Sequence, residues 1–174
     1  MRFIIFSISL FSFFLLSFAH ADDFILKTSA FSNLGRIPEL YTCDNSGQSP
    51  DLSWRNPPAK TKNFALIVSD PDAPSGTFYH WVMYNIPSDT KQLTRDMKQF
   101  PAGTLIGNNS FGTSGYKGPC PPTGAIHRYI FTLYALDSQL NLPADSDVTA
   151  VLNAMKGHIL KQTQIMGTYS RRIK

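Results

Sequence analysis

Short apolar stretches separated by turn residues dominate the chain beyond residue 22, and they predict a fold rich in β-strands. Residues 63–69 and 81–86 are apolar runs that end at an Asp-Pro and a Pro, as buried strands often do. In residues 128–135 both alternating sets of positions are largely apolar or aromatic, which indicates a strand inside a sandwich. Residues 160–171 are expected to form the last strand.

One segment near the C-terminus has helical periodicity. Its apolar positions follow the i, i+3, i+4 and i+7 spacing of one helix face. We expect Asp145 or Ser146 to cap the helix, with Asp147 in its first turn, and Gly157 to end it. The pattern therefore predicts a mainly β, antiparallel sandwich with a short helix near the C-terminus. The periodic positions are Val148, Val151, Leu152 and Met155.

The first 21 residues have the organisation of a signal peptide. Arg2 precedes an apolar run at residues 3–18, and Ala19-His20-Ala21 follows. This order is typical of a cleavable secretory leader, and the run is shorter than the roughly 20 residues of a membrane-spanning helix. We expect cleavage after Ala21, a domain of residues 22–174 without a transmembrane span, and a periplasmic or secreted location. An uncleaved anchor is the alternative.

Charge and cysteine content narrow the choice of partners. The net charge is +4 at pH 7, and the basic residues are scattered except at the C-terminus. Because a nucleic-acid binder needs a basic stripe or patch, nucleic acid is not expected as a partner. Cys43 and Cys120 would reach an oxidising compartment, which permits a disulfide, but the sequence leaves open whether they pair.

The first candidate site is the segment Asp70-Pro71-Asp72-Ala73-Pro74, which is followed by His80. The two prolines stiffen a turn that carries two carboxylates, and an imidazole opens the next predicted strand. Such a turn can also be purely structural.

The second candidate site is a loop rich in glycine and proline, residues 115–124, followed by His127-Arg128-Tyr129. In a strand, His127 and Tyr129 share one face. Arg128 would point the other way, and we expect it to form a structural ion pair. Residues 107–112 are also rich in turn formers and could line a pocket.

Four blocks of this sequence together resemble the signature of the phosphatidylethanolamine-binding protein family, which includes Raf kinase inhibitor proteins. They are Asp70-Pro-Asp-Ala-Pro74, His80-Trp81, Gly118-Pro-Cys-Pro-Pro122 and His127-Arg-Tyr129. The resemblance extends over about residues 31–169 and is nearest to the bacterial branch. It implies a Greek-key β-sandwich with a small pocket for phosphate-like or carboxylate anions. By position, the pocket residues would be Asp70, His80, Pro121, His127 and Tyr129, with Asp72, Pro74 and Gly118 shaping its walls.

The predicted function is therefore non-enzymatic binding of a small anion, namely phosphate, a phospholipid headgroup or a carboxylate, without a cofactor. Asp70 would hydrogen-bond a histidine and favour its charged form, because an opposite charge nearby does so. The imidazolium and the Tyr129 hydroxyl would then donate to the anion.

Two alternatives stay open at this stage. Asp70, Asp72, His80 and His127 are possible ligands of a metal for phosphoester hydrolysis, although the chain has no H-E-x-x-H motif and no G-x-S-x-G motif. The domain could also be a protein-interaction module that inhibits a kinase or protease. Phe78 and Tyr79 are then expected to form an exposed contact surface.

Overall fold

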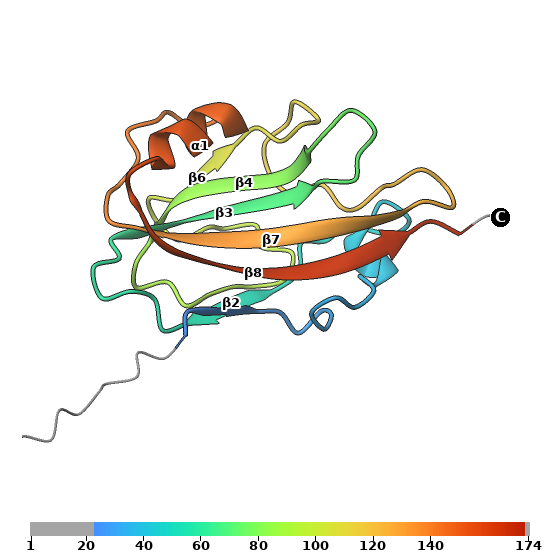
Figure 1. The fold of residues 1–174 in the computed structure, drawn as a ribbon, viewed down its shortest axis with the longest axis horizontal. Helices are drawn as coiled ribbons and strands as arrows, with labels where there is room; N and C mark the ends of the chain where they lie inside the picture. The colour runs from blue at the N-terminus through green and yellow to red at the C-terminus, as the bar shows by residue number, and fades with distance from the viewer. Residues whose placement is uncertain (1–22, 173–174) are drawn as a thin grey trace, which may run out of the picture.

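The computed structural model describes residues 23–172. The predicted signal peptide and its cleavage site therefore lie outside the described residues. Within them the chain is mainly β, with one short α-helix near the C-terminus (Figure 1), as predicted. The elements are β1 (Ile25–Lys27), η1 (Glu39–Tyr41), β2 (Leu52–Arg55), β3 (Asn63–Asp70), β4 (Phe78–Pro87), β5 (Gln92–Leu93), β6 (Leu105–Gly107), β7 (Ile126–Leu136), α1 (Val148–Met155) and β8 (Ile159–Ser170).

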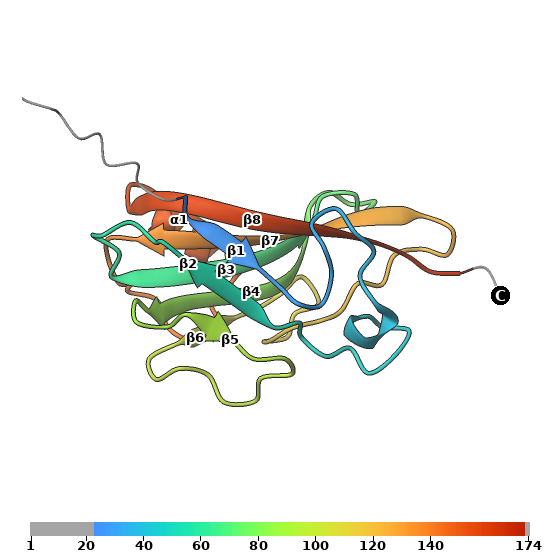
Figure 2. The same ribbon diagram turned by 90° about the horizontal axis from the view of Figure 1, so that it is seen from below.

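The strands form two antiparallel sheets, with the orders β1-β2-β5 and β6-β4-β3-β7-β8. The smaller sheet lies across one face of the larger one (Figure 2). In the larger sheet β7 returns to pair with β3 after the chain has passed through β4 and β6, which is a Greek-key arrangement. The predicted interior position of β7 is confirmed, because it pairs with β3 on one side and β8 on the other.

Both faces of the larger sheet are covered by other elements. Phe131 and Leu133 belong to the main core, which also contains Trp54 of the smaller sheet. On the opposite face Ile67 belongs to a second cluster that includes Val151 of α1. Strands that are covered on two faces need apolar residues at nearly every position, which explains the largely apolar sequences of β3, β4 and β7.

The predicted start of the helix is wrong. Asp147 is the N-cap, and its Oδ1 accepts a hydrogen bond of 2.8 Å from the Ala150 N–H. Asp145 has a positive φ of 62°, and the Ser146 hydroxyl donates instead to the Pro143 carbonyl. Hydrogen bonds to β6 and to the residue after it hold residues 145–146 outside the helix, since the Asp145 N–H donates to the Ile106 carbonyl and the Ser146 carbonyl accepts from the Asn108 N–H.

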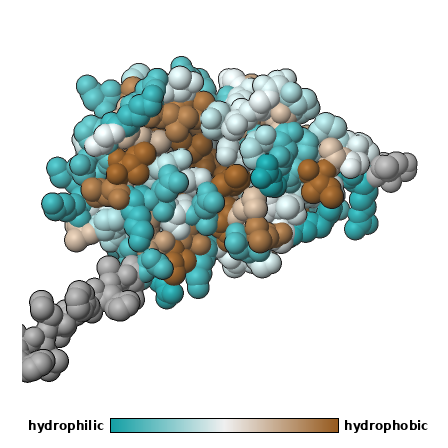
Figure 3. All heavy atoms as spheres, in the orientation of Figure 1, coloured by the Kyte–Doolittle hydropathy of each residue, from teal (hydrophilic) through white to brown (hydrophobic). Residues whose placement is uncertain are grey.

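The outer surface mixes hydrophilic and hydrophobic residues, as the space-filling view shows for one face (Figure 3). Large apolar side chains that are exposed include Phe111 near the loop end of the sandwich and Ile159 at the start of β8. None of the described helices is long and apolar enough to cross a membrane.

Candidate functional site

Several loops meet at the end of the sandwich where β3 ends and β4 and β7 begin (Figure 1). They enclose a cavity of about 180 Å³. Six of the eight predicted site residues line it, whereas Asp72 and Gly118 do not. The lining residues are Asp70, Ala73, Pro74, Phe78, His80, Phe111, Cys120, Pro121, Pro122, His127 and Tyr129.

A buried carboxylate–imidazole pair forms the floor of this site. Asp70 and His127 are only 3% and 6% exposed, and Nδ1 of His127 lies 2.7 Å from Oδ2 of Asp70. The other carboxylate oxygen of Asp70 accepts a hydrogen bond of 2.9 Å from the Asp72 N–H. Since a carboxylate oxygen accepts, Nδ1 of His127 is the donor, and Nε2 is the ring nitrogen left for a ligand.

His80 reaches the site because β4 contains a β-bulge. Val68 of β3 pairs with Trp81, and the next residue, Ser69, pairs with Tyr79, so His80 is the extra residue between them. The irregularity lets Trp81 enter the main core while its neighbour His80 lines the cavity. Bulges re-aim side chains in this way and occur often beside functional sites. The strand itself begins at Phe78, two residues before the His80 start that the sequence suggested.

The ring of His80 is fixed by the loop that follows β6. Its Nδ1 donates to the Lys117 carbonyl at 2.7 Å, and the Lys117 N–H donates back to the His80 carbonyl at 2.9 Å. Burial lowers the pKa of His80 below its ordinary value of 6.5, and the Lys117 carbonyl and the Asp70 charge offset this only in part. Free His80 is therefore neutral at pH 7, with Nε2 available to the cavity.

The phenol of Tyr129 completes the polar surface. The residue is 1% exposed, its ring lies edge-on to His80 with 5.2 Å between ring centroids, and its hydroxyl makes no hydrogen bond to any residue within 23–172. Burial, followed by the charge of Asp70 and the closeness of its carboxylate to the hydroxyl, raises the pKa of Tyr129 above its ordinary value of 10. The hydroxyl thus keeps its proton at physiological pH, and as a buried donor near the Asp70 carboxylate but without a partner within hydrogen-bond geometry among the described residues it requires an explanation.

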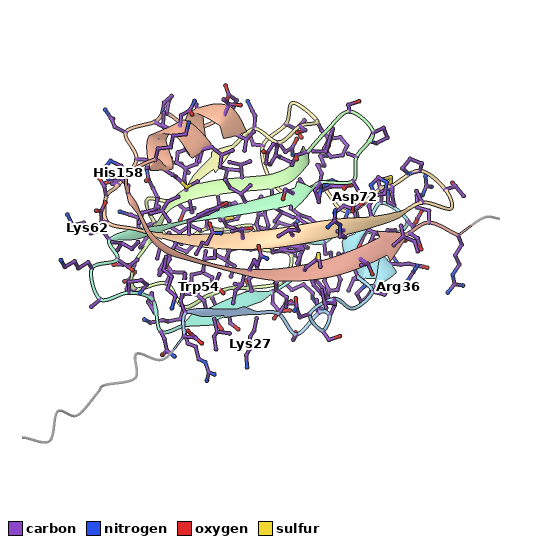
Figure 4. The ribbon with its side chains drawn as sticks, viewed as in Figure 1. Lys27, Arg36, Trp54, Lys62, Asp72 and His158 are labelled. Carbon is purple, nitrogen blue, oxygen red and sulfur yellow. A yellow bond between two sulfur atoms is a disulfide. The ribbon has the colours of Figure 1, made fainter. Side chains whose placement is uncertain are left out.

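Asp72, which Figure 4 labels, pairs with Arg128. Its two carboxylate oxygens accept from Nε of Arg128 at 2.9 Å and from a terminal guanidinium nitrogen at 2.7 Å. The structural ion pair predicted for Arg128 is thus confirmed. The contact also holds the Asp70–Asp72 turn against the start of β7, because the Arg128 N–H donates to the same carboxylate.

Gly118 does not line the cavity, but it allows the loop that carries Cys120 to pack closely against η1. A Cβ atom at this position would lie 2.5 Å from the Tyr41 carbonyl oxygen, so only glycine allows the loop to approach η1 this closely. A disulfide between Cys43 and Cys120, with 5.4 Å between the Cα atoms, joins the same two segments. The pairing that the sequence left open is therefore present.

Aromatic rings form the rim, although not the pair that the sequence suggested. Phe78 lines the cavity, but Tyr79 packs against the second core cluster on the other side of the sheet. The expectation that both are exposed is wrong, because both are half-buried. Phe111 takes the place of Tyr79: it is 48% exposed, and its ring centroid lies 4.8 Å from that of Phe78. Sequence analysis included it only within the turn-rich segment 107–112.

Within the described part of the chain, no group of three or more His, Cys, Asp or Glu side chains is placed to hold a metal ion. Asp72, one of the four residues considered for a metal, is occupied by Arg128.

Comparison with known proteins agrees with the fold. The family model described as phosphatidylethanolamine-binding protein matches residues 27–170. The chain belongs to this family. The matched segment, residues 27–170, contains all eight predicted site residues and both cysteines.

Relatives are found in several microorganisms. A UPF0098 protein from Methanothermobacter thermautotrophicus is 49% identical over 84% of this chain and 98% of its own length. A UPF0098 protein from Aquifex aeolicus is 47% identical over 82% of this chain and 85% of its own length.

Two crystal structures share the fold. One is of a protein from Chlamydia trachomatis described as a homologue of phosphatidylethanolamine-binding protein; it has a TM-score of 0.80 and 38% identity, over 85% of this chain and 97% of that one. The other is of E. coli YbcL, described as a new member of the mammalian family; it has a TM-score of 0.80 and 29% identity, over 88% of this chain and 100% of that one.

Proposed function

We propose that this protein is an exported, non-enzymatic domain that binds a small anion, either a phosphate-like group or a carboxylate, in the cavity at the loop end of the sandwich. The observation that carries the proposal is the buried Asp70–His127 pair, which lines the same cavity as His80 and the unused Tyr129 hydroxyl. Export rests on the signal-like order of the first 21 residues.

The donors in the cavity explain why an anion would bind beside a carboxylate. Asp70 uses its two oxygens on the His127 ring and the Asp72 N–H, so both oxygens already accept a hydrogen bond. Nδ1 of each histidine is already engaged, and a protonated imidazole donates from Nε2 as well. Together with the Tyr129 hydroxyl, these groups provide up to three donors for the ligand.

The size of the cavity limits the ligand. Sites for drug-sized molecules measure roughly 300–1,000 Å³, and this cavity measures about 180 Å³. It therefore suits a phosphate, a carboxylate or a similar terminal group of a larger molecule. Pro74 and Pro121 in its walls restrict the backbone, so little ordering is needed on binding.

The proposal predicts that affinity for inorganic phosphate rises as the pH falls. Burial keeps His80 neutral at pH 7, and an anion stabilises its protonated form, so binding takes up a proton. We expect affinity to be about three- to tenfold higher at pH 5.5 than at pH 7.5, since one unit of pKa shift corresponds to tenfold.

NMR titration of the purified protein with inorganic phosphate provides the test. Saturable shifts should appear at His80, His127 and Tyr129 and be stronger at the lower pH. The His158→Ala variant is a matched control, because this exposed histidine lies at the other end of the sandwich, and it should bind phosphate as the native protein does. Sulfate, whose charge does not change between the two pH values, should bind more tightly at the lower pH as well. An affinity for sulfate that is unchanged between the two pH values would contradict the proposal.

A further inference from the structure

A second hollow, of about 320 Å³, lies directly beside the anion cavity. Phe111 and Cys120 line both spaces and so form the boundary between them. The remaining walls come from Cys43 and residues 45–47, which follow η1, and from residues 116–118. We call this space the disulfide groove.

The walls of the disulfide groove are held together independently of any ligand. The Cys43–Cys120 bond joins its two sides. The Tyr116 hydroxyl donates to the Tyr41 carbonyl at 2.8 Å, and the Cys43 N–H donates to the Pro119 carbonyl at 3.1 Å. The groove is therefore preformed, and a ligand that enters it needs to order little of the protein.

The chemistry of the groove differs from that of the anion cavity. Aromatic rings and the two sulfur atoms provide much of its surface, and sulfur and aromatic groups pack favourably. Among the described residues that line it, Lys117 carries the only charge. Its backbone is engaged with His80, while its side chain is exposed. A negatively charged partner is thus favoured here and a cationic one is not.

Phe111 lies between the anion cavity and the disulfide groove, so a ligand that occupies both would contact its ring. Its ring is held by edge contacts with Phe78 and His80, at centroid distances of 4.8 and 5.6 Å. Its backbone N–H donates to the side chain of buried Asn109. A large aromatic side chain that is fixed in position and still 48% exposed offers a rigid apolar platform.

We propose that the disulfide groove is a second subsite, which holds the organic body of the ligand whose anionic group occupies the cavity. The body is a group the size of an aromatic ring, which packs against Phe111 and the disulfide and carries a second negative charge near Lys117. The inferred ligand class is an organic phosphate or carboxylate with such a body. This inference rests on the anion cavity of the proposed function.

The volume supports a body of this size. An apolar cavity of roughly 150 Å³ holds one benzene molecule, so a groove of about 320 Å³ admits a substituted ring. Inorganic phosphate would leave the groove to water and would gain nothing from it.

Calorimetric titration at pH 5.5 with inorganic phosphate, phenyl phosphate and 4-carboxyphenyl phosphate tests the inference. In the native protein we expect phenyl phosphate to bind about tenfold more tightly than inorganic phosphate, because the ring loses apolar surface to water. The carboxylate should add about threefold through Lys117, as an exposed ion pair does. Lys117→Ala should remove this threefold gain while phenyl phosphate keeps its advantage.

A bulky residue in the groove provides the decisive comparison. Ser46 is exposed and lines the groove but not the cavity, so Ser46→Trp should abolish the preference for phenyl phosphate and retain the affinity for inorganic phosphate. Ser88→Trp, in the exposed turn at the far end of β4, is the matched control and should retain all three affinities. Melting temperatures establish that both variants fold.

The outcomes separate the two proposals. If inorganic phosphate binds but phenyl phosphate binds no more tightly, the groove is not a subsite and the anion cavity stands. The same conclusion follows if Ser46→Trp keeps the full preference. If none of the three anions binds, the proposed function fails and the groove proposal fails with it.

Discussion

Two histidine–aspartate pairs lie at opposite ends of the paired strands β7 and β8 and make nearly the same hydrogen bond. His127 Nδ1 lies 2.7 Å from Asp70, and His158 Nδ1 lies 2.9 Å from Asp137. The side chains of the first pair are 7% and 5% exposed, whereas those of the second are 46% and 42% exposed. His158 is visible at the far end of the molecule from Asp72 (Figure 4).

Because the two pairs differ in burial, the same contact has different energetic consequences in each. An exposed ion pair contributes about 0–1 kcal/mol, because water competes for both partners. A buried pair leaves a desolvated group behind when one partner is removed, and this costs several kcal/mol. The buried pair also borders a cavity with an unused hydroxyl. The surroundings of the pair, more than the pair itself, therefore indicate a functional site.

The largest effect is expected from removing the crosslink at the end that holds the buried pair. The Cys43–Cys120 bond closes a long loop, with a sequence separation of 77. The double variant Cys43→Ser/Cys120→Ser should lose about 2–5 kcal/mol of unfolding free energy. Urea denaturation measures the loss.

The same variant should also weaken phosphate binding, because Cys120 lines the cavity next to Pro121. In NMR spectra, signals of His127 should broaden or move, while those of His158 should stay in place. Equal disturbance at both ends of the β7–β8 strand pair would contradict the local role assigned to the disulfide.

A direct comparison of the two pairs should give the next largest effect. Asp70→Ala leaves the buried His127 Nδ1 and the Asp72 N–H without their acceptor. We expect a loss of about 3 kcal/mol in unfolding free energy and the loss of phosphate binding. Asp137→Ala at the exposed pair should cost less than about 1 kcal/mol and leave binding intact. Similar losses in the two variants would show that burial does not distinguish the pairs.

The smallest effect concerns the Asp72–Arg128 pair, whose side chains are 28% and 51% exposed and so lie between the two extremes. Hydrogen bonds from Arg128 lower the pKa of Asp72 from 3.8 to about 2. Because the pKa of Asp72 is lower in the folded state than in the unfolded chain, this pair stabilises the fold at pH values above about 4. Its contribution is lost as the pH falls from about 4 through about 2.

NMR titration of the Asp72 carboxyl should therefore show a midpoint near 2 in the native protein. Arg128→Ala should return the midpoint toward 3.8. Lys98→Ala, which removes an exposed lysine paired with Asp96, is the control and should leave the Asp72 midpoint unchanged. A normal midpoint in the native protein would argue against the bidentate contact.

Local patterns in the sequence were sufficient to predict the strands that carry the site. The apolar runs of β3, β4 and β7 reflect burial on two faces, and the alternation of His127 and Tyr129 correctly placed both side chains on the cavity side and Arg128 on the other. Local patterns did not predict the correct N-cap of the helix. Backbone hydrogen bonds from residues 145–146 to Ile106 and Asn108 hold these two residues outside the helix, so that Asp147 is the N-cap.

The sequence by itself determined the β-rich class, because periodicity and turn chemistry are local properties. Its resemblance to the family supplied six of the residues that line the cavity. The tertiary structure decided the features that depend on contacts between distant segments. These are the bulge that directs His80 into the cavity, the ion pair between Asp72 and Arg128, the Cys43–Cys120 bond and the exposed position of Phe111. Each depends on which strands and loops become neighbours, and no short stretch of sequence records that information.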